Sequence, residues 1–149
     1  MSSPVETAFI PIGRKVNWYE VYILVNHWKS DLEFYREDIQ FLQQLIQKYL
    51  IWITKKENLE RVTEIRKKGH DLDQKCRDLQ ESVKSHLGQI VDAIQGKRTV
   101  SGEEFRTRHG QMESEYAAFV REFRQIRKEV FKVTEYVIDS EELQHILDS

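Results

Sequence analysis

Residues 18–53 read WYEVYILVNHWKSDLEFYREDIQFLQQLIQKYLIWI, and this stretch decides the fold. Its apolar residues recur at alternating intervals of three and four, which is the spacing that places side chains on one face of an α-helix. The series is Trp18, Val21, Val25, Trp28, Leu32, Tyr35, Ile39, Leu42, Ile46, Tyr49 and Ile53. Because no polar residue interrupts it, the pattern predicts a long helix that is buried along its whole seam.

Two further stretches carry the same heptad pattern, over residues 62–93 and 105–137. Unlike the first, both are interrupted, by Gly69 and His86 in the second series and by His109 in the third. Three seams of similar length favour a bundle in which each helix buries one face against the other two.

Four capping boxes mark the expected helix starts. Each places an Asn, Thr, Ser or Asp three residues before a Glu that can reach back to the cap N–H, with caps at Asn17, Thr54, Ser101 and Asp139. Gly96 follows the second series, at the position where glycine ends a helix.

The fold class follows from these boundaries. Short connections make neighbouring helices antiparallel, so we predict an all-α antiparallel bundle of three long helices at about 17–53, 55–95 and 102–138. A short fourth helix is expected within residues 139–149, and residues 1–16 are expected to be extended. Together these elements form a single domain over residues 1–149.

Gly69 leaves two interpretations of the second helix. A glycine in a helix interior costs about 1 kcal/mol relative to alanine, so the helix either kinks there or continues with Gly69 making room for bulky neighbours. The heptad phase continues across Gly69, which favours one continuous helix.

Composition limits the classes of function. With 23 Lys and Arg against 25 Asp and Glu, the formal net charge of −2 gives no overall field to attract nucleic acid or an anionic membrane. The longest apolar run, residues 21–25, is far shorter than the roughly 20 residues of a membrane span. The only cysteine, Cys76, falls on the second seam, and a lone buried thiol suits a reducing compartment. We therefore expect a cytoplasmic protein.

Some apolar residues exceed what a three-helix core requires. Leu45 and Trp52 adjoin the first seam and are expected to be core residues, whereas Phe34, Phe41 and Phe131 point further outward. Exposed aromatic residues need a cover or a partner. Either the short terminal helix folds over them, or they bind another protein or a second copy of the chain.

The histidines are the only candidates for chemistry. In an antiparallel hairpin His86 and His109 fall at nearly the same level, and Glu113 follows His109 by one turn on the same face. This spacing is used for metal ligands in helical bundles. The simpler interpretation is two boundary histidines hydrogen-bonded to a carboxylate or to water, with Leu87 taking the core position of His86.

Motifs for other chemistry are lacking. The sequence has no Gly-rich phosphate loop, Cys-x-x-Cys pair or nucleophile elbow, and the seam position of Cys76 argues against a catalytic thiol. The basic residues of 121–128 alternate with Glu122 and Glu129, so pairing within the helix is expected to neutralise them. We expect a non-enzymatic interaction or scaffolding module without a cofactor; a metal-binding bundle and, more weakly, a nucleic-acid-associated protein are the alternatives.

Overall fold

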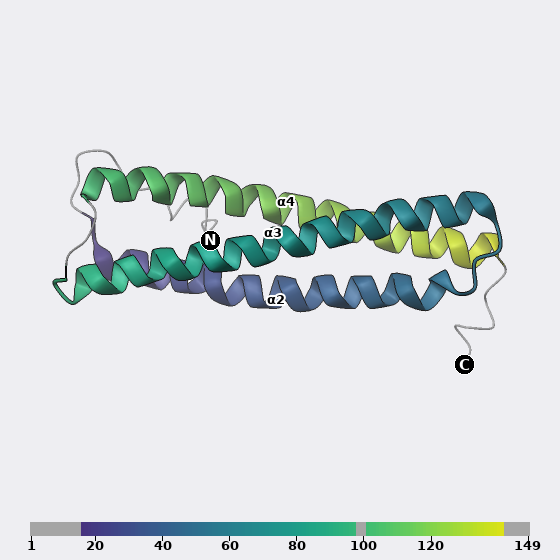
Figure 1. Cartoon of the computed structure of the whole chain (residues 1–149), viewed down its shortest axis with the longest axis horizontal. Coiled ribbons are helices and arrows are strands. Elements are labelled where there is room, and N and C mark those ends of the chain that lie inside the picture. Colours follow the sequence, from purple (N-terminus) through teal and green to yellow (C-terminus); the bar gives the residue numbers. More distant parts are fainter. Residues whose placement is uncertain (1–15, 98–100, 142–149) are drawn as a thin grey trace. The chain divides into compact units, whose positions relative to one another are not determined.

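The computed structural model describes residues 16–97 and 101–141, which form three helices and no strand (Figure 1). Helix α2 comprises Trp18–Leu50, α3 comprises Lys56–Ile94 and α4 comprises Gly102–Ser140. The prediction of an all-helical fold from three long helices is confirmed. The expected fourth helix and the expected extended start of the chain lie almost entirely outside the described residues.

The chain divides into two compact units, each built from a segment of every helix. The first unit contains residues up to Phe34 together with Cys76–Phe119, and the second contains Tyr35–Lys75 together with the residues from Val120 onward. Each unit has its own buried core, and the two are described separately below.

The heptad series supply these cores. The buried apolar residues of the first unit are Val21, Val25, Trp28, Leu32, Cys76, Leu79, Val83, Ile90, Phe105, Tyr116 and Phe119. Those of the second unit are Ile39, Leu42, Ile46, Tyr49, Val62, Ile65, Leu72, Phe123, Ile126, Val130 and Val137. Every one of them belongs to a predicted seam, because burial of that stripe is the main force that packs long amphipathic helices together.

In the first unit, aromatic contacts join α2 to α4. The rings of Trp18 and Phe105 lie 4.7 Å apart, and those of Trp28 and Tyr116 lie 5.5 Å apart. Because the residue numbers rise together on the two helices, α2 and α4 run in the same direction here.

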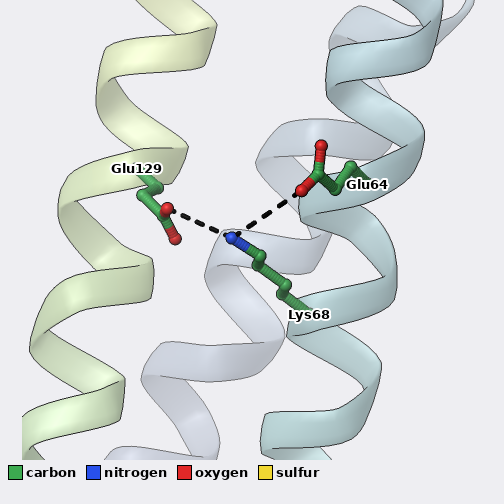
Figure 2. A network of polar contacts seen from close by, with 3 residues as sticks. All are labelled: Glu64, Lys68 and Glu129. Carbon is green, nitrogen blue, oxygen red and sulfur yellow. Dashed lines mark hydrogen bonds and ion pairs between the residues drawn. The ribbon is translucent and has the colours of Figure 1, made fainter.

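In the second unit, polar contacts join α3 to α4. Lys68 Nζ lies 3.2 Å from Glu129, and Lys75 Nζ lies 2.8 Å from Glu122. The residue number rises by seven on α3 as it falls by seven on α4, so these two helices are antiparallel. Figure 2 shows Lys68 held between Glu129 of α4 and Glu64 of its own helix.

Helix α3 continues through Gly69 without a break. A Cβ atom added to Gly69 would lie 3.7 Å from Cγ of Gln43, which is ordinary van der Waals contact. The interpretation of a continuous helix is therefore correct, and the glycine lies against α2.

Two of the capping predictions are confirmed. The Glu20 amide donates to Asn17 Oδ1 and the Glu104 amide donates to Ser101 Oγ, both at 3.2 Å. At the end of α3, Gly96 has a φ of 73° and the Lys97 amide donates to the Asp92 carbonyl, which is the expected C-terminal arrangement.

The other two capping predictions are wrong. Thr54 does not cap α3, because its hydroxyl donates to the Glu141 carboxylate at 2.5 Å, and α3 begins at Lys56. Asp139 does not open a new helix either, since α4 runs through Ser140. Helix α2 ends at Leu50, three residues before the predicted end.

Candidate functional site

The second unit exposes large apolar side chains on α2 and α4. Phe41 is 56% exposed and Phe131 is 42% exposed, while Leu45 is half-buried. A folded chain leaves single apolar residues in water without consequence, but a group of them marks a surface that contacts something.

The faces of α2 are defined by its contact with α3. Gln43 points at α3, because its Cγ lies beside Gly69. Phe41 and Leu45 are each two residues from Gln43, and two residues turn a helix by about 200°. Both side chains therefore lie on the flank of α2 that is turned away from α3.

The faces of α4 are likewise defined by its contact with α3. Glu129 points at α3, because it pairs with Lys68. Phe131 lies two residues further on, so it occupies the opposite flank of α4. Tyr35 of α2 packs edge-on against Phe123 of α4 with ring centroids 4.9 Å apart, so these two residues lie at the same height along the parallel helix segments.

Phe131 is eight residues after Phe123, while Phe41 and Leu45 are six and ten residues after Tyr35. Phe131 therefore lies at a height between Phe41 and Leu45.

Phe41, Leu45 and Phe131 together form what we call the aromatic face of the second unit. Two other predicted members are not part of it. Phe34 is 66% exposed but belongs to the first unit. Trp52 follows the end of α2, where its amide donates to the Tyr49 carbonyl, and at 45% exposure it is not a core residue as its spacing had predicted.

Opposite charges flank the aromatic face. Glu37 and Asp38 follow Tyr35 on α2, and Arg124 and Arg127 follow Phe123 on α4 at the same level. All four are exposed, and none forms an ion pair within the described residues. The Arg127 guanidinium lies 5.3 Å from the centre of the Phe131 ring, so the basic flank borders the aromatic side chain directly.

The first unit buries a pair of histidines. His86 Nε2 of α3 lies 2.9 Å from His109 Nδ1 of α4, and the side chains are only 2% and 1% exposed. One nitrogen must carry the proton of this hydrogen bond and the other must accept it. Phe105 stacks on His86 at 4.7 Å and Trp28 stacks on His109 at 5.1 Å, so aromatic rings enclose both imidazoles.

This enclosure favours the neutral form of the His86 imidazole. Burial, with repulsion from Arg108 and from His109 when it is protonated, lowers the pKa of His86 from 6.5 to about 4. A proton added to the pair would place a charge between aromatic rings. The prediction of boundary histidines is therefore wrong, as is the alternative that Leu87 replaces His86, since Leu87 is only half-buried.

The histidine pair has no carboxylate in its hydrogen bond. Glu113 is half-buried, burial raises the pKa of its carboxyl group, and its Oε2 atom has no hydrogen-bond partner among the described residues. His27 is exposed, and Asp31 accepts a hydrogen bond from the Tyr116 hydroxyl at 3.1 Å. Within residues 16–97 and 101–141, no three His, Cys, Asp or Glu side chains are placed to hold a metal ion together.

The ion pairs among the described residues include no basic side chain of α4. Glu122 and Glu129, which were expected to pair with neighbouring basic residues on the same helix, instead pair with Lys75 and Lys68 of α3 (Figure 2). The prediction of pairing within α4 is therefore wrong, because Lys68 and Lys75 of α3 lie close enough to form ion pairs with both carboxylates.

The sequence also gave no sign of the role of Glu141. Its carboxylate accepts hydrogen bonds from the amides of Thr54 and Lys55 at 3.0 Å each and from Asn58 Nδ2 at 2.9 Å. These bonds, with that from the Thr54 hydroxyl, lower the pKa of Glu141 to about 2. A side chain 87 positions away in sequence thus caps α3, a contact that local spacing does not predict.

No known protein-family model matches the chain, and no curated protein or solved structure is significantly similar to it. Nor is any helix of the described part long and apolar enough to cross a membrane.

Proposed function

We propose that the protein is a non-enzymatic interaction module that self-associates through the aromatic face of its second unit. The observation that supports this most is the combination on one surface of exposed Phe41 and Phe131 with an acidic flank on α2 and a basic flank on α4. The buried thiol of Cys76 is compatible with a reducing compartment, and we propose the cytoplasm.

A second copy is the partner because the face complements itself. A two-fold axis parallel to the helices would lay α2 of one copy over α4 of the other. Glu37 and Asp38 would then meet Arg124 and Arg127 of the second copy, since these residues lie at one level along the two helices. An interface of this kind repeats the same contacts on both sides of the axis.

The apolar contacts supply the driving force. The same two-fold arrangement brings Phe41 of one copy against Phe131 of the other, and Leu45 follows one turn later. Burying one such side chain contributes about 1.5 to 3 kcal/mol. The flanking charges contribute mainly to orientation and to the choice of partner.

Light scattering of Phe41→Glu tests this proposal. The matched control is Leu59→Glu, which introduces the same charge at a side chain of similar exposure, 47%, in the same unit. Leu59 lies two residues before Arg61, which stacks on Tyr136 of α4, so Leu59 points away from α4 and from the aromatic face.

We expect Phe41→Glu to be a monomer with unchanged helical content and thermal midpoint, while Leu59→Glu has the same mass as the unmodified chain. If Phe41→Glu unfolds the protein, Phe41 is a core residue and the interface proposal is wrong. If both variants keep the mass of an associated unmodified chain, association uses a different surface.

A further inference from the structure

A groove of about 530 Å³ lies between α3 and α4 in the second unit, on the flank of α4 away from the aromatic face. Its lining residues are Arg61, Glu64, Ile65 and Lys68 of α3 and Gln125, Lys128, Glu129, Lys132 and Val133 of α4. Four cations and two carboxylates therefore surround two aliphatic side chains, which leaves an excess of positive charge in a protein whose formal net charge is −2.

The two carboxylates share one cation. Lys68 Nζ lies 3.2 Å from Glu129 and 4.0 Å from Glu64, so a single lysine offsets part of their combined charge (Figure 2). Arg61 stacks on the Tyr136 ring at 4.3 Å, which fixes its guanidinium beside the groove without cancelling its charge.

Lys128 and Lys132 are the cations available to a ligand. Both are exposed, and neither forms an ion pair or hydrogen bond with another residue in the described part of the chain. They are four residues apart on α4, so their side chains lie about one helical turn apart on the same edge of the groove.

We propose that this groove binds an acidic amphipathic helix of a protein partner. Carboxylates one turn apart on that helix would meet Lys128 and Lys132, and a third would meet Arg61. Its apolar residues would cover the half-buried Val133. The groove between two antiparallel helices is the place where a further helix completes a bundle.

The chemistry of the groove distinguishes a helix from a nucleic acid. A phosphate backbone carries negative charge at every residue and would meet Glu64 and Glu129 as well as the lysines, at an electrostatic cost. A protein helix can present carboxylates opposite the lysines and neutral residues opposite the two glutamates.

Fluorescence anisotropy tests the proposal with a labelled synthetic helix that has leucine on one face and glutamate pairs four residues apart beside it. We compare the unmodified full-length chain with Lys128→Glu/Lys132→Glu. The matched control is Lys84→Glu/Lys97→Glu, which changes the net charge equally at two exposed lysines of the first unit.

We expect the unmodified chain to bind the acidic helix, with an affinity that falls as salt is added. Lys128→Glu/Lys132→Glu should weaken binding at least about tenfold, with an unchanged thermal midpoint, and the control should bind normally. The proposal is wrong if the unmodified chain does not bind, if the groove variant binds as well as the control, or if a helix with lysine in place of glutamate binds equally. Stronger binding of duplex DNA or inorganic triphosphate would identify a polyanion site and also overturn it.

Discussion

His86 Nε2 and His109 Nδ1 are joined by a hydrogen bond of 2.9 Å between side chains that water barely reaches. Both imidazoles occupy seam positions that the other heptads fill with apolar residues. The hydrogen bond involves one nitrogen of each ring, and aromatic side chains stack on the ring faces. The pair therefore belongs to the core only while it is neutral.

Acid should therefore destabilise the first unit. The unfolded chain protonates His86 at a pKa of about 6.5, whereas the folded chain does so at about 4. The stability that depends on the neutral pair is complete above pH 6.5 and is lost as the pH falls toward 4. We expect the free energy of unfolding to fall by about 2 kcal/mol between pH 8 and pH 5, measured by urea unfolding.

Two variants isolate this effect from the titration of carboxylates. His27→Gln removes an exposed histidine and should leave the acid sensitivity as it is. His86→Leu/His109→Leu replaces the pair with apolar side chains and should remove most of the loss between pH 8 and pH 5. An equal loss in the double variant would show that other groups govern the acid sensitivity.

Charge exchange tests the orientation of the proposed dimer. Glu37→Arg/Asp38→Arg makes both flanks of the aromatic face basic, and Arg124→Glu/Arg127→Glu makes both acidic, so each variant alone should be monomeric through repulsion. Mixing the two should pair a basic flank with an acidic flank at both charged contacts and allow a heterodimer, detected by native mass spectrometry. Homodimers of either variant at undiminished affinity would exclude the proposed two-fold arrangement.

Glu141 should stabilise the start of α3. Glu141→Gln keeps the size of the side chain but removes the charge that accepts hydrogen bonds from Thr54, Lys55 and Asn58. We expect a lower thermal midpoint at pH 7 and a much smaller difference at pH 2. The folded pKa is about 2 against an ordinary 4.5, so the stability that the ionised carboxylate contributes is lost as the pH falls over this range.

The control for Glu141 is Glu135→Gln, an exposed carboxylate of α4. Its thermal midpoint should match that of the unmodified chain at both pH values. An effect as large as that of Glu141→Gln would assign the change to net charge and not to capping.

Gly69→Ala should raise stability. A Cβ at this position meets Gln43 at 3.7 Å and borders a small apolar void lined by Ile39, Leu42, Ile126 and Val130. Alanine therefore adds packing without a clash and gains about 1 kcal/mol in helix propensity. Chemical unfolding measures the gain, and a loss of stability would mean that α2 and α3 approach each other more closely than this geometry allows.

The sequence predicted the parts of the fold that depend on local periodicity. The seam series anticipated every buried apolar residue named above, because helical spacing alone determines which side chains share a face. Asn17 and Ser101 were identified as caps for the same reason, since the cap and its amide are three residues apart.

What local spacing did not predict depends on contacts between distant segments. Thr54 has the sequence of a cap, but Glu141 reaches it from the end of α4. Glu122 and Glu129 have basic neighbours on their own helix, yet they form ion pairs with lysines of α3. His86 has an apolar neighbour that could have replaced it, and its position in the core follows from the presence of His109 opposite.

Light scattering of the unmodified protein across a range of concentrations measures whether the aromatic face joins two copies of this chain. We expect a mass that rises with concentration to twice the chain mass of 17.9 kDa. A mass of one chain at every concentration up to the millimolar range would contradict it.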